Sequence, residues 1–304
     1  MSEGAIAGFA LTRAAPAKIN LALHVVGQRA DGHHLLESLV TFADRGDRIG
    51  LAPAAEDRFT VSGPFAAELP RDADAQGSNL VLKARDSLRA ELQSRGLATA
   101  GPVHLHLEKN LPLASGIGGG SADAAATLHG LLELWGATIE AERLDAIALK
   151  LGADVPMCLR GRPLLARGIG EEITALRGFP ALSMVLVNPL VAVSTPVVFR
   201  TLIDKTNPPL ELPPVPLTQG DWFHVLTTLR NDLQPPAETL QPVIATVRQT
   251  LAQAGAVLVR MSGSGATCFG LFANDDLALE AANRLSVARP EWYVLGCRTT
   301  GAGA

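Results

Sequence analysis

The chain has 304 residues, of which 47% are hydrophobic and 18% charged, and its formal net charge is −4 at pH 7. This composition excludes a disordered chain, and the length is enough to bury a full hydrophobic core in two modest domains or one large one. Because no basic cluster stands out, the sequence argues against a nucleic-acid partner, which would require concentrated lysine and arginine.

The cysteines and the apolar segments bear on the cellular compartment. The three cysteines are widely spaced and lack the paired spacing of a metal site: Cys158, Cys268 and Cys297. Such thiols predict a reducing, cytoplasmic location. Residues 1–10 lack the basic start of a secretory signal. The most apolar segment, 181–199, contains Asn188, Pro189 and Pro196, so we predict two strands with a turn there and no membrane partner.

Strand signals dominate the first part of the chain. Extended segments are predicted at 11–26, 35–51 and 58–61. Asp31-Gly32 is typical of a turn between the first two. Apolar residues at three- and four-residue steps then predict a helix over 79–95, with Gly96 after its last residue.

A glycine-dense stretch is the most informative feature of the sequence. A predicted strand at 103–107 leads into 112–123, which reads Pro-Leu-Ala-Ser-Gly-Ile-Gly-Gly-Gly-Ser-Ala-Asp. Glycines let several backbone N–H groups approach one anion, and the following helix adds the positive end of its dipole. The stretch has neither the Gly-Lys-Ser/Thr ending of a P-loop nor the spaced glycines of a dinucleotide fold. We therefore predict a phosphate-binding loop, rather than a flexible surface turn, with Ser121 in the first helical turn.

The second half of the sequence mixes helices and strands. Helices are predicted at 139–151, 239–254 and 277–289, and strands at 184–187, 191–193, 256–261, 266–272 and 292–297. A domain change is predicted near 160–170, and the proline-rich segment 207–216 is expected to form a surface connection. Because strands and helices do not alternate strictly, the pattern favours α+β domains.

Two charged residues are candidates for catalysis. Asp154 follows the predicted helix 139–151 and can accept a hydroxyl proton during phosphoryl transfer, although a turn-forming aspartate fits its spacing equally well. Lys18, between Ala17 and Ile19, can hold a carboxylate ionised or neutralise a phosphoryl group if it lines a cleft. Spacing alone favours a solvated strand lysine.

Two histidine pairs and a second glycine loop allow alternatives. His104 and His106 share one face of a predicted strand, but no third ligand has matching spacing, so the pattern disfavours a metal site. His33 and His34 follow a turn, where rings can meet a flat ligand. The loop Ser-Gly-Ser-Gly at 262–265 fits either a tight hairpin or a second approach to an anion.

Together these motifs resemble the GHMP superfamily of small-molecule kinases. The resemblance rests on Pro-Ala-Lys-Ile-Asn-Leu at 16–21, Asp-Gly-His-His at 31–34, the loop at 112–123, Gly-Ala-Asp-Val-Pro at 152–156 and Met-Ser-Gly-Ser-Gly-Ala-Thr at 261–267. It is strongest to the members that phosphorylate a cytidine-diphosphate-linked methylerythritol. It implies a two-domain α+β fold, with a ribosomal protein S5 domain 2-like N-terminal domain at 1–165, a ferredoxin-like C-terminal domain at 166–304 and the active site in the cleft between them.

The resemblance implies an activity and its cofactors. ATP, with Mg²⁺, would phosphorylate the 2-hydroxyl of the small-molecule substrate in the non-mevalonate route to isoprenoid precursors, and the enzyme would be a monomer or weak homodimer. Lys18 and Asp154 would form the catalytic pair. A homoserine or mevalonate kinase would leave the cytidine motif at 31–34 without a role, and a non-catalytic sugar-binding protein would have no need of the retained catalytic residues.

The resemblance also assigns binding residues. The loop around the ATP phosphates would comprise Pro112, Leu113, Ala114, Ser115, Gly116, Ile117, Gly118, Gly119, Gly120, Ser121 and Ala122, with Ser121 near the metal ion. Asn79 and Lys109 would line the adenine pocket, and Asn20, His33, His34, Thr195 and Phe199 would bind the substrate. The sequence departs from the family pattern at His33, where a tyrosine is frequent, and at Ala114 and Ser115, where glycines are.

Overall fold

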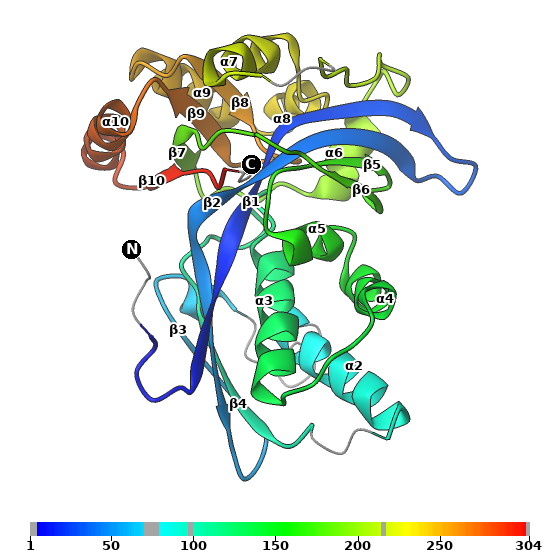
Figure 1. Cartoon of the computed structure of the whole chain (residues 1–304). Helices are drawn as coiled ribbons and strands as arrows, with labels where there is room; N and C mark the ends of the chain where they lie inside the picture. The colour runs from blue at the N-terminus through cyan, green and yellow to red at the C-terminus, as the bar shows by residue number, and fades with distance from the viewer. Residues whose placement is uncertain (1–4, 70–78, 97–99, 214–216, 302–304) are drawn as a thin grey trace. The chain divides into compact units, whose positions relative to one another are not determined.

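The chain forms two compact units that interleave along the sequence. The computed structural model describes residues 5–69, 79–96, 100–213 and 217–301 (Figure 1). The first unit comprises Met1–Ala17, Arg45–Leu113 and Gly118–Arg160, and the second comprises Lys18–Asp44, Ala114–Ile117 and Gly161–Ala304. Long strands pass from one unit into the other, so the domain division at 165/166 stays a prediction.

Strands of the first unit pair around β4 (Val103–Glu108). This strand pairs antiparallel with residues 48–53 of β2 (His34–Pro53) and parallel with β3 (Arg58–Ser62), which lies at the sheet edge as predicted. Alternate residues of β4 are buried, so His104 and His106 share the opposite face. Strand β1 (Leu11–Gln28) pairs with β2.

Most helices of the first unit follow their sequence signals, but the last of them was not predicted. They are α2 (Leu80–Ser94), α3 (Gly119–Leu134), α4 (Ala141–Leu151) and α5 (Val155–Arg160), with a short 3₁₀ turn η1 at Ala66–Glu68. Helices α2 and α3 pack side by side (Figure 1). The Asn79 side chain caps α2 by accepting from the Val81 N–H at 2.9 Å. Gly136, with φ +59°, follows Trp135, the C-cap residue of α3.

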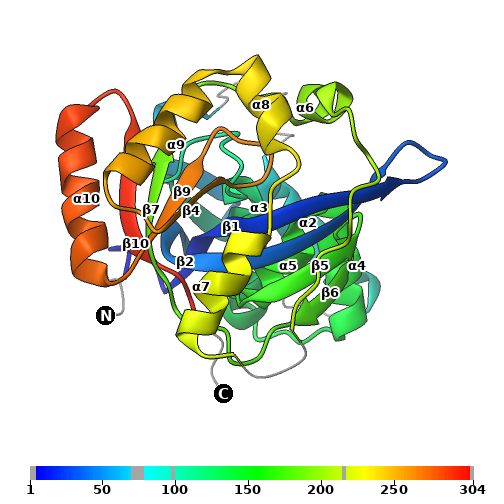
Figure 2. The same ribbon diagram turned by 90° about the horizontal axis from the view of Figure 1, so that it is seen from above.

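A four-stranded antiparallel sheet forms the core of the second unit. Its order is β10 (Tyr293–Arg298), β7 (Ser183–Asn188), β9 (Cys268–Phe272) and β8 (Leu258–Met261). Every residue of β7 is buried, and α9 (Val243–Gln253) and α10 (Asp275–Ala288), which run beside this sheet, share a hydrophobic core with Val185 and Val187 (Figure 2). The α+β prediction is confirmed in both units.

The remaining elements of the second unit were largely missed by the sequence patterns. They are β5 (Leu164–Gly168), β6 (Glu172–Ala175), α6 (Thr195–Thr201), α7 (Gln219–Thr228) and α8 (Gln234–Leu240). Strand β5 pairs with residues 36–40 of β2 and with β6. These elements have four to ten residues, which is too short for periodicity to identify them.

Two predicted elements were wrong. The segment 191–193 is not a strand, and 181–199 contains only β7 before α6 begins, because Pro196 fits the first turn of a helix. The predicted helix 239–254 is two helices, since Pro242 cannot continue α8 and α9 begins immediately after it. Of the proline-rich connection, 207–213 is irregular, and 214–216 lies outside the described residues.

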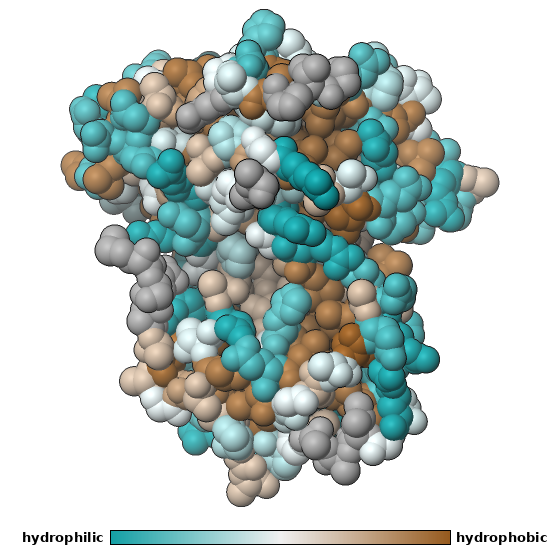
Figure 3. All heavy atoms as spheres, in the orientation of Figure 1, coloured by the Kyte–Doolittle hydropathy of each residue, from teal (hydrophilic) through white to brown (hydrophobic). Residues whose placement is uncertain are grey.

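The visible surface is of mixed polarity. On the face in Figure 3, hydrophilic and hydrophobic residues are interspersed over the surface that the structure describes. Large exposed apolar side chains include Val287, at 84% exposure, and Ile203, at 99%. None of the helices in the described parts of the chain has the length and apolar character that a bilayer span requires.

Candidate active site

Three consecutive carbonyls of the glycine loop are held inside the second unit. The Ser115 carbonyl accepts from the Thr267 N–H (3.1 Å), the Gly116 carbonyl from the Ser262 hydroxyl (3.0 Å) and the Ile117 carbonyl from the Lys18 N–H (2.9 Å). The second glycine loop, 262–265, therefore packs against the first. Residues 262–265 connect β8 to β9, which pair antiparallel, so this loop forms a hairpin, one of the two alternatives that the sequence left open. A part of the second loop in anion binding stays a prediction.

These carbonyl contacts set the direction of three N–H groups. In a trans peptide the C=O of one residue and the N–H of the next point in opposite directions. The N–H groups of Gly116 and Ile117 therefore point away from Thr267 and Ser262, and the Gly118 N–H points away from Lys18 of β1. Within the described residues, none of the three has a protein acceptor. Successive donors of this kind can form an anion-binding concavity, and the phosphate-binding role of the loop stays a prediction.

Glycine is required within this loop at two positions. Gly116 has φ +77° and Gly118 has φ +63°, both in the left-handed region. A Cβ atom on Gly116 would lie 2.6 Å from the Ser262 carbonyl oxygen and 2.7 Å from that of Gly265. Ala114 adopts the left-handed region as well, with φ +48°, at a position where the family carries glycine. The loop thus keeps its conformation at some conformational cost.

Helix α3 begins without a side-chain cap. Gly118 stands at its N-cap position, and the first intrahelical bond runs from the Ala122 N–H to the Gly118 carbonyl at 2.9 Å. The N–H groups of Gly119, Gly120 and Ser121 precede that bond, so they have no acceptor within the helix. Ser121 is half-buried in this first turn. The positive end of the helix is thus open to an anion.

Lys109 is committed to a buried ionic cluster in the first unit. Its ammonium donates to Asp47 and, at 3.0 Å, to Asp123, and all three side chains are at most 4% exposed. Asp47 also accepts from the N–H groups of Asn110 (2.6 Å) and Leu111 (2.8 Å). The cluster therefore fixes the segment that leads into the glycine loop against the start of α3. The adenine-pocket role of Lys109 stays a prediction.

The electrostatics of this cluster follow from its burial. Burial raises the pKa of the Asp123 carboxyl to about 8, although the Lys109 ammonium opposes the rise. Burial by itself would lower the pKa of Lys109, but Asp123 and Asp47 outweigh it and raise that pKa. Two carboxylates with one ammonium carry an excess negative charge, which a proton on Asp123 removes.

Lys18 and Asn20 lie on β1 in the second unit. Lys18 is 4% exposed, so the alternative of a solvated strand lysine is wrong. The Asn20 amide nitrogen donates to the Ser38 hydroxyl (2.7 Å), which itself donates to the Ala22 carbonyl (2.7 Å). Asn20 Oδ1 is buried and has no partner within the described part of the chain. This oxygen can accept a hydrogen bond from a ligand hydroxyl or amino group.

Asp154 stands at the start of a helix that the sequence did not predict. Its carbonyl accepts from the Cys158 N–H at 3.1 Å, in the first turn of α5, and its side chain is half-buried. The carboxylate is therefore held on the rim of a short buried helix rather than in an open loop. Its catalytic role stays a prediction, as does the turn-forming alternative.

The predicted substrate residues of the second unit include one aromatic pair. The His34 ring stacks on Phe199 of α6, with centroids 4.7 Å apart and planes 24° apart. His34 Nε2 is buried and has no partner among the residues described. His33 does not join this pair, because its side chain is 65% exposed and its Nδ1 lies 3.2 Å from Asp31 Oδ1. The Thr195 hydroxyl shares a 2.6 Å hydrogen bond with Ser264.

The other histidine pair is engaged in side-chain hydrogen bonds. Thr60 Oγ1 lies 2.8 Å from His104 Nε2 and 2.8 Å from His106 Nδ1. His106 Nε2 lies 2.8 Å from the Ser62 hydroxyl. Over the described ranges, no group of three or more histidine, cysteine or acidic side chains could hold a metal ion.

The predicted site residues divide between the two units. The second unit holds Lys18, Asn20, His33, His34, Ala114, Ser115, Gly116, Ile117, Thr195 and Phe199. The first holds Asn79, Lys109, Pro112, Leu113, Gly118, Gly119, Gly120, Ser121, Ala122 and Asp154. Sequence patterns missed Asp47, Ser38, Ser262 and Ser264 as partners of these residues. Only the last two carried a signal, the second glycine loop.

Comparison with known proteins agrees with this geometry. Residues 79–162 match the family model of the GHMP kinases N terminal domain, and residues 218–289 match that of the GHMP kinases C terminal. The chain is 66% identical over 301 residues to a protein of Sinorhizobium medicae and 51% identical over 293 residues to one of Brucella melitensis. These alignments cover 99% and 95% of both chains, and both relatives are named 4-diphosphocytidyl-2-C-methyl-D-erythritol kinase. The chain belongs to this family of GHMP kinases.

Solved structures of GHMP kinases place the family in its wider fold. A crystal structure of 4-(cytidine 5'-diphospho)-2C-methyl-D-erythritol kinase matches with a TM-score of 0.77 at 33% identity, covering 96% of this chain and all (100%) of the other. A homoserine kinase from Cytophaga hutchinsonii matches with a TM-score of 0.68 at 20% identity, covering 95% and 94%. The second likeness shows the fold alone. The two-domain GHMP kinase fold predicted from sequence is thereby confirmed.

Proposed function

We propose that this chain transfers the γ-phosphate of ATP to the 2-hydroxyl of 4-diphosphocytidyl-2-C-methyl-D-erythritol. The products are the 2-phosphate and ADP, in the non-mevalonate route to isoprenoid precursors. The observation that carries the proposal is the set of aligned N–H groups at Gly116, Ile117 and Gly118, which have no protein acceptor in the described chain. The proposal places the reaction in the cytoplasm, with a monomer or weak homodimer as the acting form.

The glycine loop and the start of α3 bind the phosphates in this proposal. Backbone N–H donors and a helix N-terminus offset phosphate charge without a protein cation. Bound Mg²⁺ supplies further neutralisation of the phosphate oxygens. Ser121, in the first turn of α3, would be the protein residue near this ion.

Lys18 and Asp154 act on the acceptor alcohol in this proposal. Asp154 accepts a hydrogen bond from the 2-hydroxyl and takes its proton as the bond to phosphorus forms. An alkoxide is much harder to form than a carboxylate is to protonate, so full early deprotonation is not required of Asp154. Lys18 supplies a fixed positive charge for the carboxylate and the alcohol. Positioning and charge neutralisation then carry the catalysis, as a loose phosphoryl transition state allows.

The cytidine end of the substrate is assigned to the aromatic pair. The outer face of the His34–Phe199 stack can take a pyrimidine ring. Asn20 Oδ1 can accept a hydrogen bond from the sugar-alcohol or ribose portion. His33 and Thr195 complete the assigned set, and Asn79 and Lys109 are assigned to the adenine pocket.

The proposal is tested by ADP release from the purified protein. Incubation with ATP, Mg²⁺ and the cytidine-linked diphosphate should give turnover, while homoserine and mevalonate should give none. Asp154→Ala should reduce turnover to background. Lys18→Ala should lower kcat far more than the affinity for ATP. Turnover with homoserine or mevalonate instead, at a rate that Asp154→Ala abolishes, would refute the assigned substrate.

A further inference from the structure

Ser262 lies between β1 and the glycine loop. Its side chain is fully buried, at 0% exposure, and its oxygen accepts from the Asn20 N–H at 3.0 Å. The same hydroxyl donates to the Gly116 carbonyl at 3.0 Å. A hydroxyl has a single hydrogen, so the Asn20 contact leaves that hydrogen for Gly116. Both the position of Ser262 and the direction of its hydrogen bond are therefore defined.

Three hydrogen bonds hold the carbonyls of Ser115, Gly116 and Ile117, and the bond from Ser262 is the one among them that a side chain donates. The Ser115 and Ile117 carbonyls accept from main-chain N–H groups, which every residue except proline provides. Gly116, with φ +77°, sits in a region where glycine tolerates more than one peptide orientation. Since the Gly116 carbonyl and the Ile117 N–H belong to one peptide plane, Ser262 decides where that N–H points.

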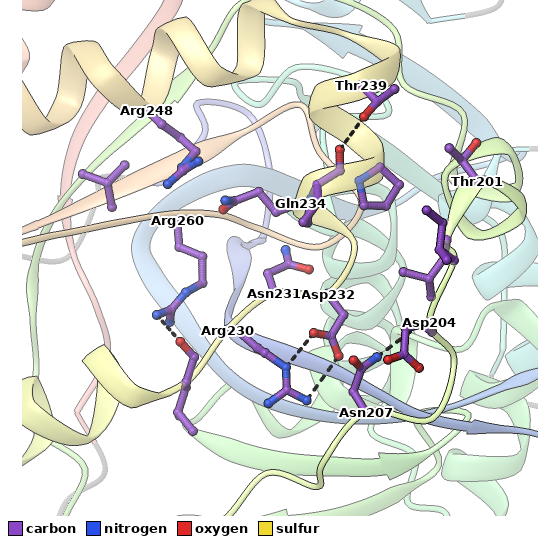
Figure 4. Close-up of a pocket in the computed structure, with 16 residues that line it drawn as sticks. Thr201, Asp204, Asn207, Arg230, Asn231, Asp232, Gln234, Thr239, Arg248 and Arg260 are labelled. Carbon is purple, nitrogen blue, oxygen red and sulfur yellow. Dashed lines mark hydrogen bonds and ion pairs between the residues drawn. The ribbon is translucent and has the colours of Figure 1, made fainter.

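Ser262 is itself held from the far side of its loop. The Asn231 amide donates to the Met261 carbonyl (2.7 Å) and the Gly263 carbonyl (2.9 Å), and Gln234 Oε1 accepts from the Met261 N–H (3.0 Å). Asn231 and Gln234 lie side by side in the wall of a pocket of about 620 Å³ in the second unit (Figure 4). The second glycine loop is thus held by hydrogen bonds on both sides, so the Ser262 hydroxyl has a fixed position against the phosphate loop.

We propose that Ser262 is a positioning residue for phosphoryl transfer, whose hydroxyl aims the Ile117 N–H at the phosphates of the nucleotide. The inference rests on the proposed function, because it takes nucleotide phosphates as the ligand of the loop. It concerns the phosphate-binding half of the site only. Its effect should therefore follow the phosphate groups of a ligand and not its base.

The test compares three ligands on one variant. Ser262→Ala removes the hydroxyl, and we expect about 10-fold weaker binding of ATP and of inorganic tripolyphosphate, because one charge-assisted hydrogen bond loses its alignment. Binding of adenosine, which has no phosphate, should not change. Ser262→Thr retains the hydroxyl and should recover most of the affinity. Ser183→Ala is the matched control, since Ser183 is a buried serine of the same unit that donates to Asp275.

Each outcome bears on one of the two proposals. Failure of the wild-type protein to bind either ATP or tripolyphosphate would refute the proposed function. If the wild type binds both and Ser262→Ala binds them equally well, the positioning role is wrong. Equal weakening of adenosine and ATP would show a structural role only and would also overturn it. Should Ser262→Ala not fold, Ser262→Cys decides, because its weaker thiol donor should give intermediate affinity for tripolyphosphate with unchanged affinity for adenosine.

Discussion

The imidazole of His34 stacks on the phenyl ring of Phe199, with 4.7 Å between centroids and 24° between planes. His34 begins β2, and Phe199 lies in α6, so two distant parts of the sequence form one aromatic stack in the second unit. A pyrimidine base can stack on the outer face of such a pair regardless of its edge pattern. The cytidine assignment makes this pair a specificity element.

Phe199→Ala should raise KM for the cytidine-linked substrate by roughly 10-fold and leave KM for ATP nearly unchanged. Stacking of a base on an aromatic ring contributes about 1–3 kcal/mol to binding, which sets this magnitude. Phe9→Ala is the control, because Phe9 packs on His104 and His106 in the first unit. Steady-state kinetics with each substrate varied separately measure both constants. An equal rise in KM for ATP would contradict the assignment.

The affinity for the cytidine-linked substrate should fall at acidic pH. Burial, with the positive charges of Lys205 and His33, lowers the pKa of His34 below its ordinary value, so the ring is neutral at pH 7. Protonation at lower pH places a charge in the aromatic pair beside Lys205, which should raise KM for this substrate. A His34→Asn variant should show a flat KM between pH 5 and 8. A parallel rise in that variant would assign the effect to another group.

Local signals explain what could be predicted from the sequence. The stop of α2 at Gly96 depends on the backbone preference of a single residue, and Gly96 lies there with φ +74°. The glycine loop was placed by the same kind of signal, and its phosphate-binding role stays a prediction. Helix α2 followed from its periodicity. The families of small-molecule kinases share these local patterns, which is why the resemblance could be stated from short motifs.

The contacts that align the site could not be predicted in this way. Ser262 bonds to Gly116 across 146 positions of sequence, and Lys109 bonds to Asp47 across 62. Partners at such separations depend on strand register and on packing, which periodicity does not encode. The burial of Lys18 depends on the same long-range packing, so spacing alone wrongly favoured a solvated side chain for it.

Lys109→Met should destabilise the protein by about 3–5 kcal/mol, because the buried Asp47 carboxylate would lose its counterion. Asp47 is 0% exposed and Asp123 4% exposed, so solvent cannot replace the ammonium. Arg143→Met is the matched control, since Arg143 pairs with Glu91 at 2.8 Å but is 58% exposed. That change should cost less than about 1 kcal/mol. Urea unfolding of both variants provides the comparison, and equal losses would show that burial of the cluster is unimportant.

The stability of the wild-type protein should decrease between mildly acidic and mildly basic pH because of Asp123. Its pKa is about 8 in the folded protein against an ordinary value of 3.8, so between these values the folded state binds the additional proton. The free energy of unfolding contributed by this group is therefore fully present below pH 3.8 and is lost as pH rises through 8. Asp123→Asn carries no titratable group there. The unfolding free energies of wild type and Asp123→Asn are measured across this pH range with a chelator present. As pH rises, the variant should become more stable relative to the wild type. A difference that stays constant would exclude a proton on Asp123.

Ala114→Gly should stabilise the protein slightly. Ala114 has φ +48°, and an L-residue in the left-handed region costs about 1–2 kcal/mol. Glycine removes that cost but adds roughly 0.4–1 kcal/mol of chain entropy to the unfolded state, so the net gain should be at most about 1.5 kcal/mol. Ala114→Val should destabilise, because a β-branched side chain tolerates positive φ even less well than alanine. Thermal unfolding of the three proteins should rank them Gly, Ala, Val from highest to lowest Tm. A lower Tm for the glycine variant than for the wild type would show that the strain at residue 114 is smaller than the added entropy of the unfolded chain.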